Sequence, residues 1–464
     1  MSSPMVIIGA GLCGSLLAIR LAQRGFEVEV YERRPDMRLS KEVAGRSINL
    51  ALSDRGIKGL KLAGLEGIVE REGIPMTGRM IHPKHGEPML QKYSGREGEN
   101  INSISRRGLN IALMNEAEKY PKVHFHFEMN CVHVAFDKKK VVLKNAQDQS
   151  EIEVDAECIF GADGAGSAVR QSMMPLTAQL RFNFSQHFLE QGYKELEIPA
   201  LPDAGFRMAK NALHIWPRGS FMMIALPNLE GSFTVTLFFP FAGENGFDHL
   251  NTPEKVKQFF ETNFPDAIPH MPDLLHEYES NPTGILGTIQ CFPWQVGGGS
   301  LLMGDAAHAI VPFYGQGMNA SFEDVVVLDE LIDRHGQDWD TIFKEFQEIR
   351  KPNTDAIADL AIDNFYEMRD QTANPVFQRK GKLETKLEQT FPDYFSKYSM
   401  VTFREDLPYQ EAMIRGRAQN EFLLDLVADL DDIEGLNLLD IKQRTQAFAE
   451  QRMVEFNMKV PGSR

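Results

Sequence analysis

The chain has 464 residues, of which 43% are hydrophobic and 25% charged, a balance typical of folded proteins with two or three domains at this length. Its formal net charge of −16 argues against a nucleic-acid partner. No apolar run reaches the roughly 18 residues that span a bilayer, and a strand begins too early to leave room for a signal peptide. We therefore expect a cytoplasmic protein without a membrane anchor.

Cysteine and histidine spacing gives no sign of disulfides or metal. The four cysteines show no paired spacing, so we interpret them as reduced thiols. The twelve histidines form no ligand motif, so we predict no metal site. The cysteines are Cys13, Cys131, Cys158 and Cys291.

The first predicted elements form a dinucleotide-binding unit. Met5–Ile8 is a short apolar strand, Leu12–Arg24 has the apolar periodicity of a helix, and the next strand, Glu27–Tyr31, ends at Glu32. The turn between the first strand and the helix reads GAGLCG, with glycines at positions 9, 11 and 14. This order predicts an ADP-binding site in which Glu32 accepts from a ribose hydroxyl. It does not distinguish NAD from FAD.

A second glycine-rich turn follows another predicted strand. Ile159–Gly161 leads into Ala162–Gly166, with Asp163 at its start and a helical pattern after it. Taken alone, an Asp-Gly pair predicts only a turn.

The next region has the sequence pattern of a β-sheet. Leu213–Pro217, Phe221–Leu226 and Ser232–Phe239 alternate with turn signals and predict antiparallel strands of a substrate-covering sheet. Asn251–Tyr278 is mostly helical in pattern. Phe233 and Phe238 fit a ring-binding role and a core role equally well.

The third motif, Gly304–Asn319, reads GDAAHAIVPFYGQGMN. Asp305 follows an apolar strand, where its carboxylate can hydrogen-bond a polyol, and Gly315–Gly317 precedes a predicted helix start at Asn319. Free N–H groups at a helix start can hold an electron-rich group. A flavin needs both features. Farther on, Glu411–Leu430 has the apolar spacing of a helix and predicts a C-terminal helical cap.

In this order, the three motifs resemble those of the single-component (class A) flavoprotein aromatic hydroxylases. The resemblance implies an α/β fold with an FAD-binding Rossmann-like domain, an inserted antiparallel-sheet substrate domain as in 4-hydroxybenzoate hydroxylase, and a C-terminal helical region. The motif positions divide the chain into a discontinuous FAD domain (1–75, 100–180 and 285–370), a substrate domain (76–99 and 181–284) and a helical cap (371–464).

The same resemblance implies how FAD is held. The first motif binds the ADP half, Asp163 lies near the pyrophosphate, and the third motif holds the ribityl chain through Asp305 and the pyrimidine edge of the ring through its glycine turn. Arg46 and Arg106 are basic candidates near the cofactors. The implied cofactor-binding residues are Gly9, Gly11, Gly14, Glu32, Arg33, Arg106, Asp163, Asp305, Gly315, Gln316, Gly317, Met318 and Asn319.

Outside the motifs, most of the chain is similar to the kynurenine 3-monooxygenase family, for example at Gly78–Met80, Gly192–Leu196, Asn211–Pro217 and Tyr398–Phe403. This resemblance implies an FAD monooxygenase that converts L-kynurenine to 3-hydroxykynurenine with NADPH and O2 through a flavin C4a-hydroperoxide, in tryptophan degradation and NAD biosynthesis. Because the flavin carries this chemistry, no side chain is assigned as catalytic.

Substrate recognition is assigned to five residues. An arginine binds a carboxylate with two parallel hydrogen bonds, and Arg79 is suited to the α-carboxylate of kynurenine. The resemblance adds Tyr93 and Tyr398 beside it. Asn364 and Glu367 lie three apart and share a helix face; periodicity alone favours a solvated face, whereas the resemblance places them at the polar end of the substrate site.

Several points stay open. A hydroxylase of the same fold with another aromatic acid as substrate is one alternative, and a non-redox binding protein such as the prenylated-GTPase escort proteins is another. We expect His308 to be a structural hydrogen-bonding residue, and we assign no role to Tyr314. No second GxGxxG unit is present, so NADPH is expected to dock near the flavin. The tail, Gln451–Arg464, is polar, and the oligomeric state is open, with a homodimer among the alternatives.

Overall fold

The computed structural model describes residues 3–39, 49–371 and 374–456, so Arg46 lies outside the described residues. The chain forms two compact units, each built from three stretches of sequence. Unit 1 comprises Met1–Gly73, Ile104–Phe188 and Gly287–Ala358, and unit 2 comprises Ile74–Ser103, Leu189–Leu286 and Asp359–Arg464. Our three-part division of the chain stays a prediction.

Unit 1 is built on a six-stranded sheet in the order β18-β19-β12-β1-β2-β8, in which only the edge strand β18 is antiparallel. The central strands are continuous apolar runs, as expected for parallel strands buried on both faces. The strands are β1 (Met5–Ile8), β2 (Val28–Tyr31), β8 (Val123–His126), β12 (Cys158–Gly161), β18 (Gln295–Val296) and β19 (Ser300–Leu302).

The helices of unit 1 pack around α1, which contacts both α4 and α10, and α2 lies against α10. Arg20 in α1 forms an ion pair with Asp329 in α10 at 2.9 Å, which joins the two helices at the edge of the core. These helices are α1 (Leu12–Gln23), α2 (Asp54–Leu62), α4 (Arg106–Ala117) and α10 (Gly317–His335).

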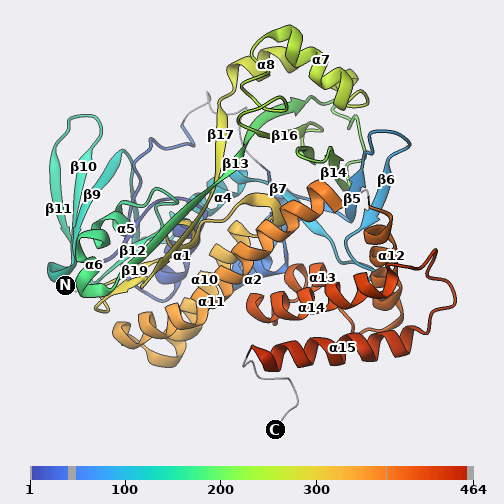
Figure 1. Cartoon of the computed structure of the whole chain (residues 1–464). Coiled ribbons are helices and arrows are strands. Elements are labelled where there is room, and N and C mark those ends of the chain that lie inside the picture. The colour runs from blue at the N-terminus through green and yellow to red at the C-terminus, as the bar shows by residue number, and fades with distance from the viewer. Residues whose placement is uncertain (1–2, 40–48, 372–373, 457–464) are drawn as a thin grey trace. The chain divides into compact units, whose positions relative to one another are not determined.

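A three-stranded antiparallel sheet also belongs to unit 1 (Figure 1). Its strands are β9 (Met129–Ala135), β10 (Lys140–Asn145) and β11 (Glu151–Asp155). Other elements within this unit are β3 (Asn49–Leu52), α3 (Gly67–Glu72), α5 (Ala168–Met173), α6 (Thr177–Leu180), α9 (Asp305–His308), and the 3-10 turns η1 (Phe136–Lys138), η2 (Met174–Leu176) and η4 (Pro312–Tyr314).

A seven-stranded sheet in the order β17-β13-β16-β15-β14-β5-β6 belongs mainly to unit 2, and β13 and β17 each continue into unit 1. Its pairs are antiparallel where β13 meets β16, β16 meets β15, β15 meets β14 and β5 meets β6, whereas β14 and β5 run parallel. The strands are β5 (Gly78–Ile81), β6 (Met89–Lys92), β13 (Asn183–Ile198), β14 (Ala212–Pro217), β15 (Met222–Pro227), β16 (Phe233–Pro240) and β17 (Thr283–Phe292).

Two helices, α7 (Pro253–Asn263) and α8 (Leu274–Ser280), share an apolar core with this sheet. The sequence predicted one mostly helical stretch here. Pro265, Pro269 and Pro272 interrupt it, because proline cannot continue a helix interior, and the 3-10 turn η3 (Ile268–His270) lies between the two helices.

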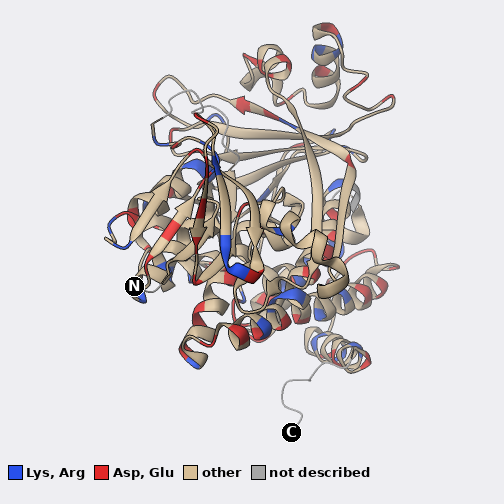
Figure 2. Ribbon diagram, turned by 90° about the vertical axis from the view of Figure 1, so that its left-hand side faces the viewer, with Lys and Arg blue, Asp and Glu red and all other residues tan. Residues whose placement is uncertain are grey.

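The C-terminal region is helical, and α14 packs against both α13 and α15 (Figure 1). Both basic and acidic positions occur along the C-terminal helices (Figure 2). Among the described helices, none combines the length and the apolar character needed to cross a membrane. The helices are α12 (Pro375–Thr390), α13 (Lys397–Thr402), α14 (Tyr409–Val427) and α15 (Leu438–Glu455). Elements that pass from one unit into the other include α11 (Trp339–Tyr366), β4 (Gly73–Met76) and β7 (Ile101–Ser105), and a π-helical turn, η5 (Glu367–Gln371), follows α11.

Candidate functional site

The first glycine turn is built as the sequence predicts. Gly9 has φ 106°, which favours glycine, and a Cβ there would lie 2.5 Å from the carbonyl oxygen of Ala162. A Cβ on Gly14 would lie 2.0 Å from the carbonyl oxygen of Gly9. At Gly11, in contrast, a Cβ would meet no atom within 4 Å. The outer glycines are therefore needed for packing, while the side of the turn at Gly11 is open to a ligand's close approach.

Glu32 stands at the end of β2, next to this turn. Its Oε2 accepts from the backbone N–H of Ala10 at 3.0 Å, and its Oε1 accepts from Nε of Arg34 at 2.7 Å. Burial raises the pKa of Glu32, but the hydrogen bonds from Arg34 and Ala10 outweigh burial, and the net shift is downward. Glu32 is therefore an ionised acceptor beside the glycine turn.

The second motif touches the first. A Cβ on Gly9 would lie 2.9 Å from Cα of Asp163. Asp163 Oδ2 accepts from the backbone N–H of Ala168, the first residue of α5, at 2.6 Å. Burial raises the pKa of this carboxyl group despite that bond. Asp163 thus holds the turn in place, and its part in cofactor binding stays a prediction.

The third motif also meets the first turn. Gly304 has φ 57°, and a Cβ there would lie 3.2 Å from Sγ of Cys13, inside the first glycine motif. Asp305 begins α9 and is partly exposed. All three motifs therefore converge on one turn, the arrangement that a single extended dinucleotide requires.

A buried ion network holds the third motif, and sequence analysis missed all of it except His308. Asp324, which is fully buried in α10, accepts from Gly304 N at 2.8 Å, from Nε2 of His308 at 2.7 Å and from Nε of Arg350 at 2.7 Å. Arg350 also pairs with Glu323, which pairs with Arg55 at 2.7 Å. His308 is thus a buried hydrogen-bonding residue of this network, in the role we expected.

Burial raises the pKa values of Glu323 and Asp324, but their cationic partners outweigh burial and lower both. The available sequence signal was the adjacent pair of acids in the helix that was predicted to start at Asn319, because two buried carboxylates need buried cations.

The glycine turn of the third motif is held by Asn319. Its Oδ1 accepts from Ser53 N at 3.0 Å, and its Nδ2 donates to the carbonyls of Ala51 and Gly315, each at 2.8 Å. Gln316 Oε1 accepts from the Ser53 hydroxyl at 3.2 Å. These two side chains therefore hold the turn in place. The backbone of Gly315–Asn319 is the part of this turn that can bind a ligand.

The remaining predicted cofactor residues are Arg33, Arg106 and Met318. Arg33 and Arg106 are exposed, Arg33 after β2 and Arg106 at the start of α4. Met318 is 9% exposed within α10. The roles of both arginines in cofactor binding stay predictions.

In unit 2, three of the predicted substrate residues come together. The rings of Tyr93 and Tyr398 stack with their centroids 5.2 Å apart and their planes 11° from parallel. The guanidinium carbon of Arg79 lies 4.6 Å from the centre of the Tyr398 ring and 5.7 Å from that of Tyr93. Burial raises the pKa values of both hydroxyl groups, and Arg79 lowers them by less, so both tyrosines keep their protons.

Asn364 and Glu367 lie at the end of α11 and in η5. Asn364 is 2% exposed, and its Nδ2 contacts Sδ of Met368 at 3.2 Å, so it does not lie on a solvated face. Glu367 forms an ion pair with Lys397, a buried residue that sequence analysis missed, and Oε1 also accepts from Nδ2 of Asn420 at 3.4 Å. A Cβ on Gly416 would lie 2.4 Å from Cγ of Lys397, so this glycine makes room for the lysine stem.

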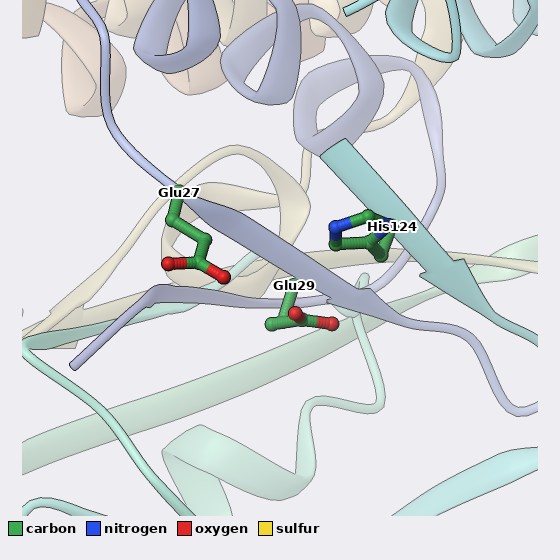
Figure 3. A group of neighbouring side chains, drawn as sticks. All are labelled: Glu27, Glu29 and His124. Carbon is green, nitrogen blue, oxygen red and sulfur yellow. The ribbon is translucent and has the colours of Figure 1, made fainter. Parts of the chain in front are cut away.

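A separate group in unit 1 has side chains that could hold a metal ion. Glu27, Glu29 and His124 lie on and beside neighbouring strands β2 and β8, with ligand atoms within 4.8 Å of one another (Figure 3). Glu29 Oε2 is also 2.5 Å from Nε2 of His126. Exposed acidic groups of this kind are common without a metal, so we assign no role to this group.

Comparison with known proteins decides the family. The family described as "FAD binding domain" matches residues 2–360. Kynurenine 3-monooxygenase of Myxococcus xanthus is 46% identical over 435 residues, with 94% of this chain and 93% of that protein covered. The protein of the same name in Dictyostelium discoideum is 46% identical over 454 residues, with 95% and 96% covered. The chain belongs to the kynurenine 3-monooxygenase family.

Solved structures of lower identity share the fold. The chain matches 2-methyl-3-hydroxypyridine-5-carboxylic acid oxygenase with a TM-score of 0.65 and 20% identity, over 83% of this chain and 97% of that one. It matches HpxO of Klebsiella pneumoniae, complexed with FAD, with a TM-score of 0.64 and 19% identity, over 83% and 94%. The expected α/β fold with a Rossmann-like FAD domain, an antiparallel sheet and C-terminal helices is confirmed.

Proposed function

We propose that the chain is an FAD-dependent monooxygenase that hydroxylates L-kynurenine to 3-hydroxykynurenine with NADPH and O2. The observation that carries the proposal is its 46% identity, over 94% of its length, to a kynurenine 3-monooxygenase. The geometry supports it, because unit 1 gathers three dinucleotide-binding motifs and unit 2 gathers a cation with two protonated phenols.

FAD fits the residues of unit 1. The open side of Gly11 allows the pyrophosphate to approach the backbone at the start of α1, and the ionised Glu32 is an acceptor for ribose hydroxyls. Asp305, partly exposed, is an acceptor for the ribityl chain. The backbone of Gly315–Asn319, fixed by the Asn319 amide, presents N–H groups at the start of α10 to the pyrimidine edge of the ring.

Unit 2 supplies recognition of an α-amino acid. Arg79 binds the substrate carboxylate, and Tyr93 and Tyr398, which stay protonated, donate hydrogen bonds to it. Their stacked rings cover the guanidinium and exclude water from the ion pair, which strengthens it. Glu367 is neutralised by Lys397, so it meets the substrate as half of an ion pair rather than as a lone anion.

Bound FAD supplies hydride acceptance from NADPH and activation of O2. The chain's own task is to orient the aromatic ring and to keep water out. No protein base is assigned, because the aniline nitrogen of kynurenine already donates electrons to the ring. We also propose a cytoplasmic location, which the four free cysteines support; the NADPH docking position and a homodimer stay predictions.

The test is a spectrum followed by a substrate panel. We expect the purified protein to be yellow, with flavin absorbance, and kynurenine to accelerate NADPH oxidation more than other aromatic acids do. A different preferred acid would support the related-hydroxylase alternative. A colourless protein that FAD does not reconstitute would support the non-redox binding protein.

A further inference from the structure

We infer that Glu388 is a positioning residue that holds Tyr93 and Tyr398 in their stack beside Arg79; this inference rests on the proposed function. Glu388 lies in α12 and is 4% exposed. Its Oε2 accepts from the backbone N–H of Gly95 at 2.9 Å, and its Oε1 accepts from the backbone N–H of Ser396 at 2.8 Å. One buried carboxylate therefore bonds to both tyrosine-bearing segments.

The positions of these two N–H groups matter. Gly95 follows Tyr93 by two residues, and Ser396 precedes Tyr398 by two residues. A bond to each backbone therefore limits how far either ring can slide from the other. Because both bonds go to a carboxylate, they are stronger than bonds between neutral groups.

Close packing reinforces the same junction. A Cβ on Gly95 would lie 2.7 Å from the carbonyl oxygen of Thr385 and 3.0 Å from Cβ of Glu388, so the loop touches α12 directly. Arg96 donates to the carbonyls of Tyr394 and Pro392, and its guanidinium carbon lies 3.9 Å from the centre of the Phe395 ring. The loop after β6 and the loop before α13 are thus tied together with Glu388 between them.

At the start of α13, the backbone N–H of Ser396 is available to donate to Glu388. Ser396 is the N-cap of α13, and its side chain accepts from Ser399 N at 3.2 Å. Its own backbone N–H precedes the helix and needs an outside acceptor, which Glu388 provides. Tyr398 follows as the second residue of the helix.

Glu388→Gln is the main test, because glutamine has the same shape but replaces one accepting oxygen with a donor that faces an N–H. We expect the KM for kynurenine to rise about tenfold with little change in kcat. The matched control is Glu384→Gln, a buried glutamate one turn earlier in α12 that pairs with Lys380 at 2.8 Å. It should leave the KM within about twofold.

A second readout separates positioning from general damage. Kynuramine lacks the α-carboxylate, so its affinity does not use Arg79 or the tyrosine hydroxyls. Glu388→Gln should reduce the preference for kynurenine over kynuramine in titrations of the holoenzyme, with kynuramine affinity unchanged. Equal loss for both ligands, or no loss for either, would overturn the inference. Failure of kynurenine to bind the unmodified holoenzyme would instead overturn the proposed function.

A backbone variant guards against misfolding of Glu388→Gln. Ser396 has φ −64°, which proline adopts, so Ser396→Pro deletes the N–H that Glu388 accepts. Ser396→Ala loses the cap hydroxyl but keeps that N–H. We expect the proline variant to raise the KM several-fold above the alanine variant. Equal KM values in the two variants would contradict the role of the Glu388–Ser396 bond.

Discussion

We propose that recognition of the amino-acid end of the substrate depends on Arg79. Its guanidinium lies against the stacked rings of Tyr93 and Tyr398, so a carboxylate bound there is sheltered from water. A hydrogen bond to a charged group contributes about 1.5–3 kcal/mol, and a bidentate pair has two.

Arg79→Met should therefore raise the KM for kynurenine by about 10- to 100-fold, and flavin content should not change, because the predicted FAD residues belong to unit 1. Steady-state kinetics with flavin quantification checks this. Arg71→Met, at an exposed position in α3, is the control and should leave the KM unchanged. An unaltered KM in Arg79→Met would show that the carboxylate binds elsewhere.

At the scale of elements, α10 depends on buried charge. Arg350 is 2% exposed and contacts Asp324 and Glu323, two adjacent carboxylates of that helix. Removing one partner of a buried ion pair typically costs about 3–5 kcal/mol, because the other charge is left without compensation.

Arg350→Met should lower the stability by about that amount and loosen the third motif, so thermal melting and FAD retention should fall together. Arg334→Met removes an arginine of α10, whereas Arg350 belongs to α11; the Arg334 side chain is 55% exposed in its pair with Glu345, and the change should cost less than about 1 kcal/mol. Equal melting temperatures for the two variants would contradict the importance of the buried network.

Elements whose signals are local were predictable from sequence. Alternating apolar and polar residues, together with turn residues, predicted the bounds of β14, β15 and β16 to within one residue. The three glycine motifs likewise lie at turns next to strands or helices, as their sequence predicted. Pairings between distant side chains were not predictable. Glu388 and Gly95 are separated by 293 positions, and Lys397 resembles any surface lysine until Glu367 and Gly416 enclose it.

At the scale of the whole molecule, the charge states of buried groups make folding sensitive to acid. Partner cations and hydrogen bonds outweigh burial and lower the pKa values of four carboxyl groups of unit 1, and burial lowers that of His214 in unit 2 from 6.5 to about 4. The unfolded chain therefore binds protons at a higher pH than the folded chain does. The four carboxyl groups belong to Glu32, Glu323, Asp324 and Asp329.

We expect the melting temperature to decline as the pH falls from 6.5 toward about 4, as unfolded His214 takes up its proton, and more steeply below the ordinary carboxyl values of 3.8 to 4.5. Glu99, Asp163, Glu277 and Glu384 work in the opposite sense, because burial raises their pKa values, but more groups have a lowered pKa. Circular dichroism melts across this range test the sign. A melting temperature that rises on acidification would contradict it.

We propose that this chain inserts an oxygen atom from O2 into kynurenine. The most direct measurement is to incubate the holoenzyme with kynurenine, NADPH and isotopically labelled O2, and to identify the product by mass. We expect 3-hydroxykynurenine that carries one labelled oxygen, formed in proportion to the NADPH oxidised. Unlabelled product, or NADPH oxidation without any hydroxylated kynurenine, would contradict it.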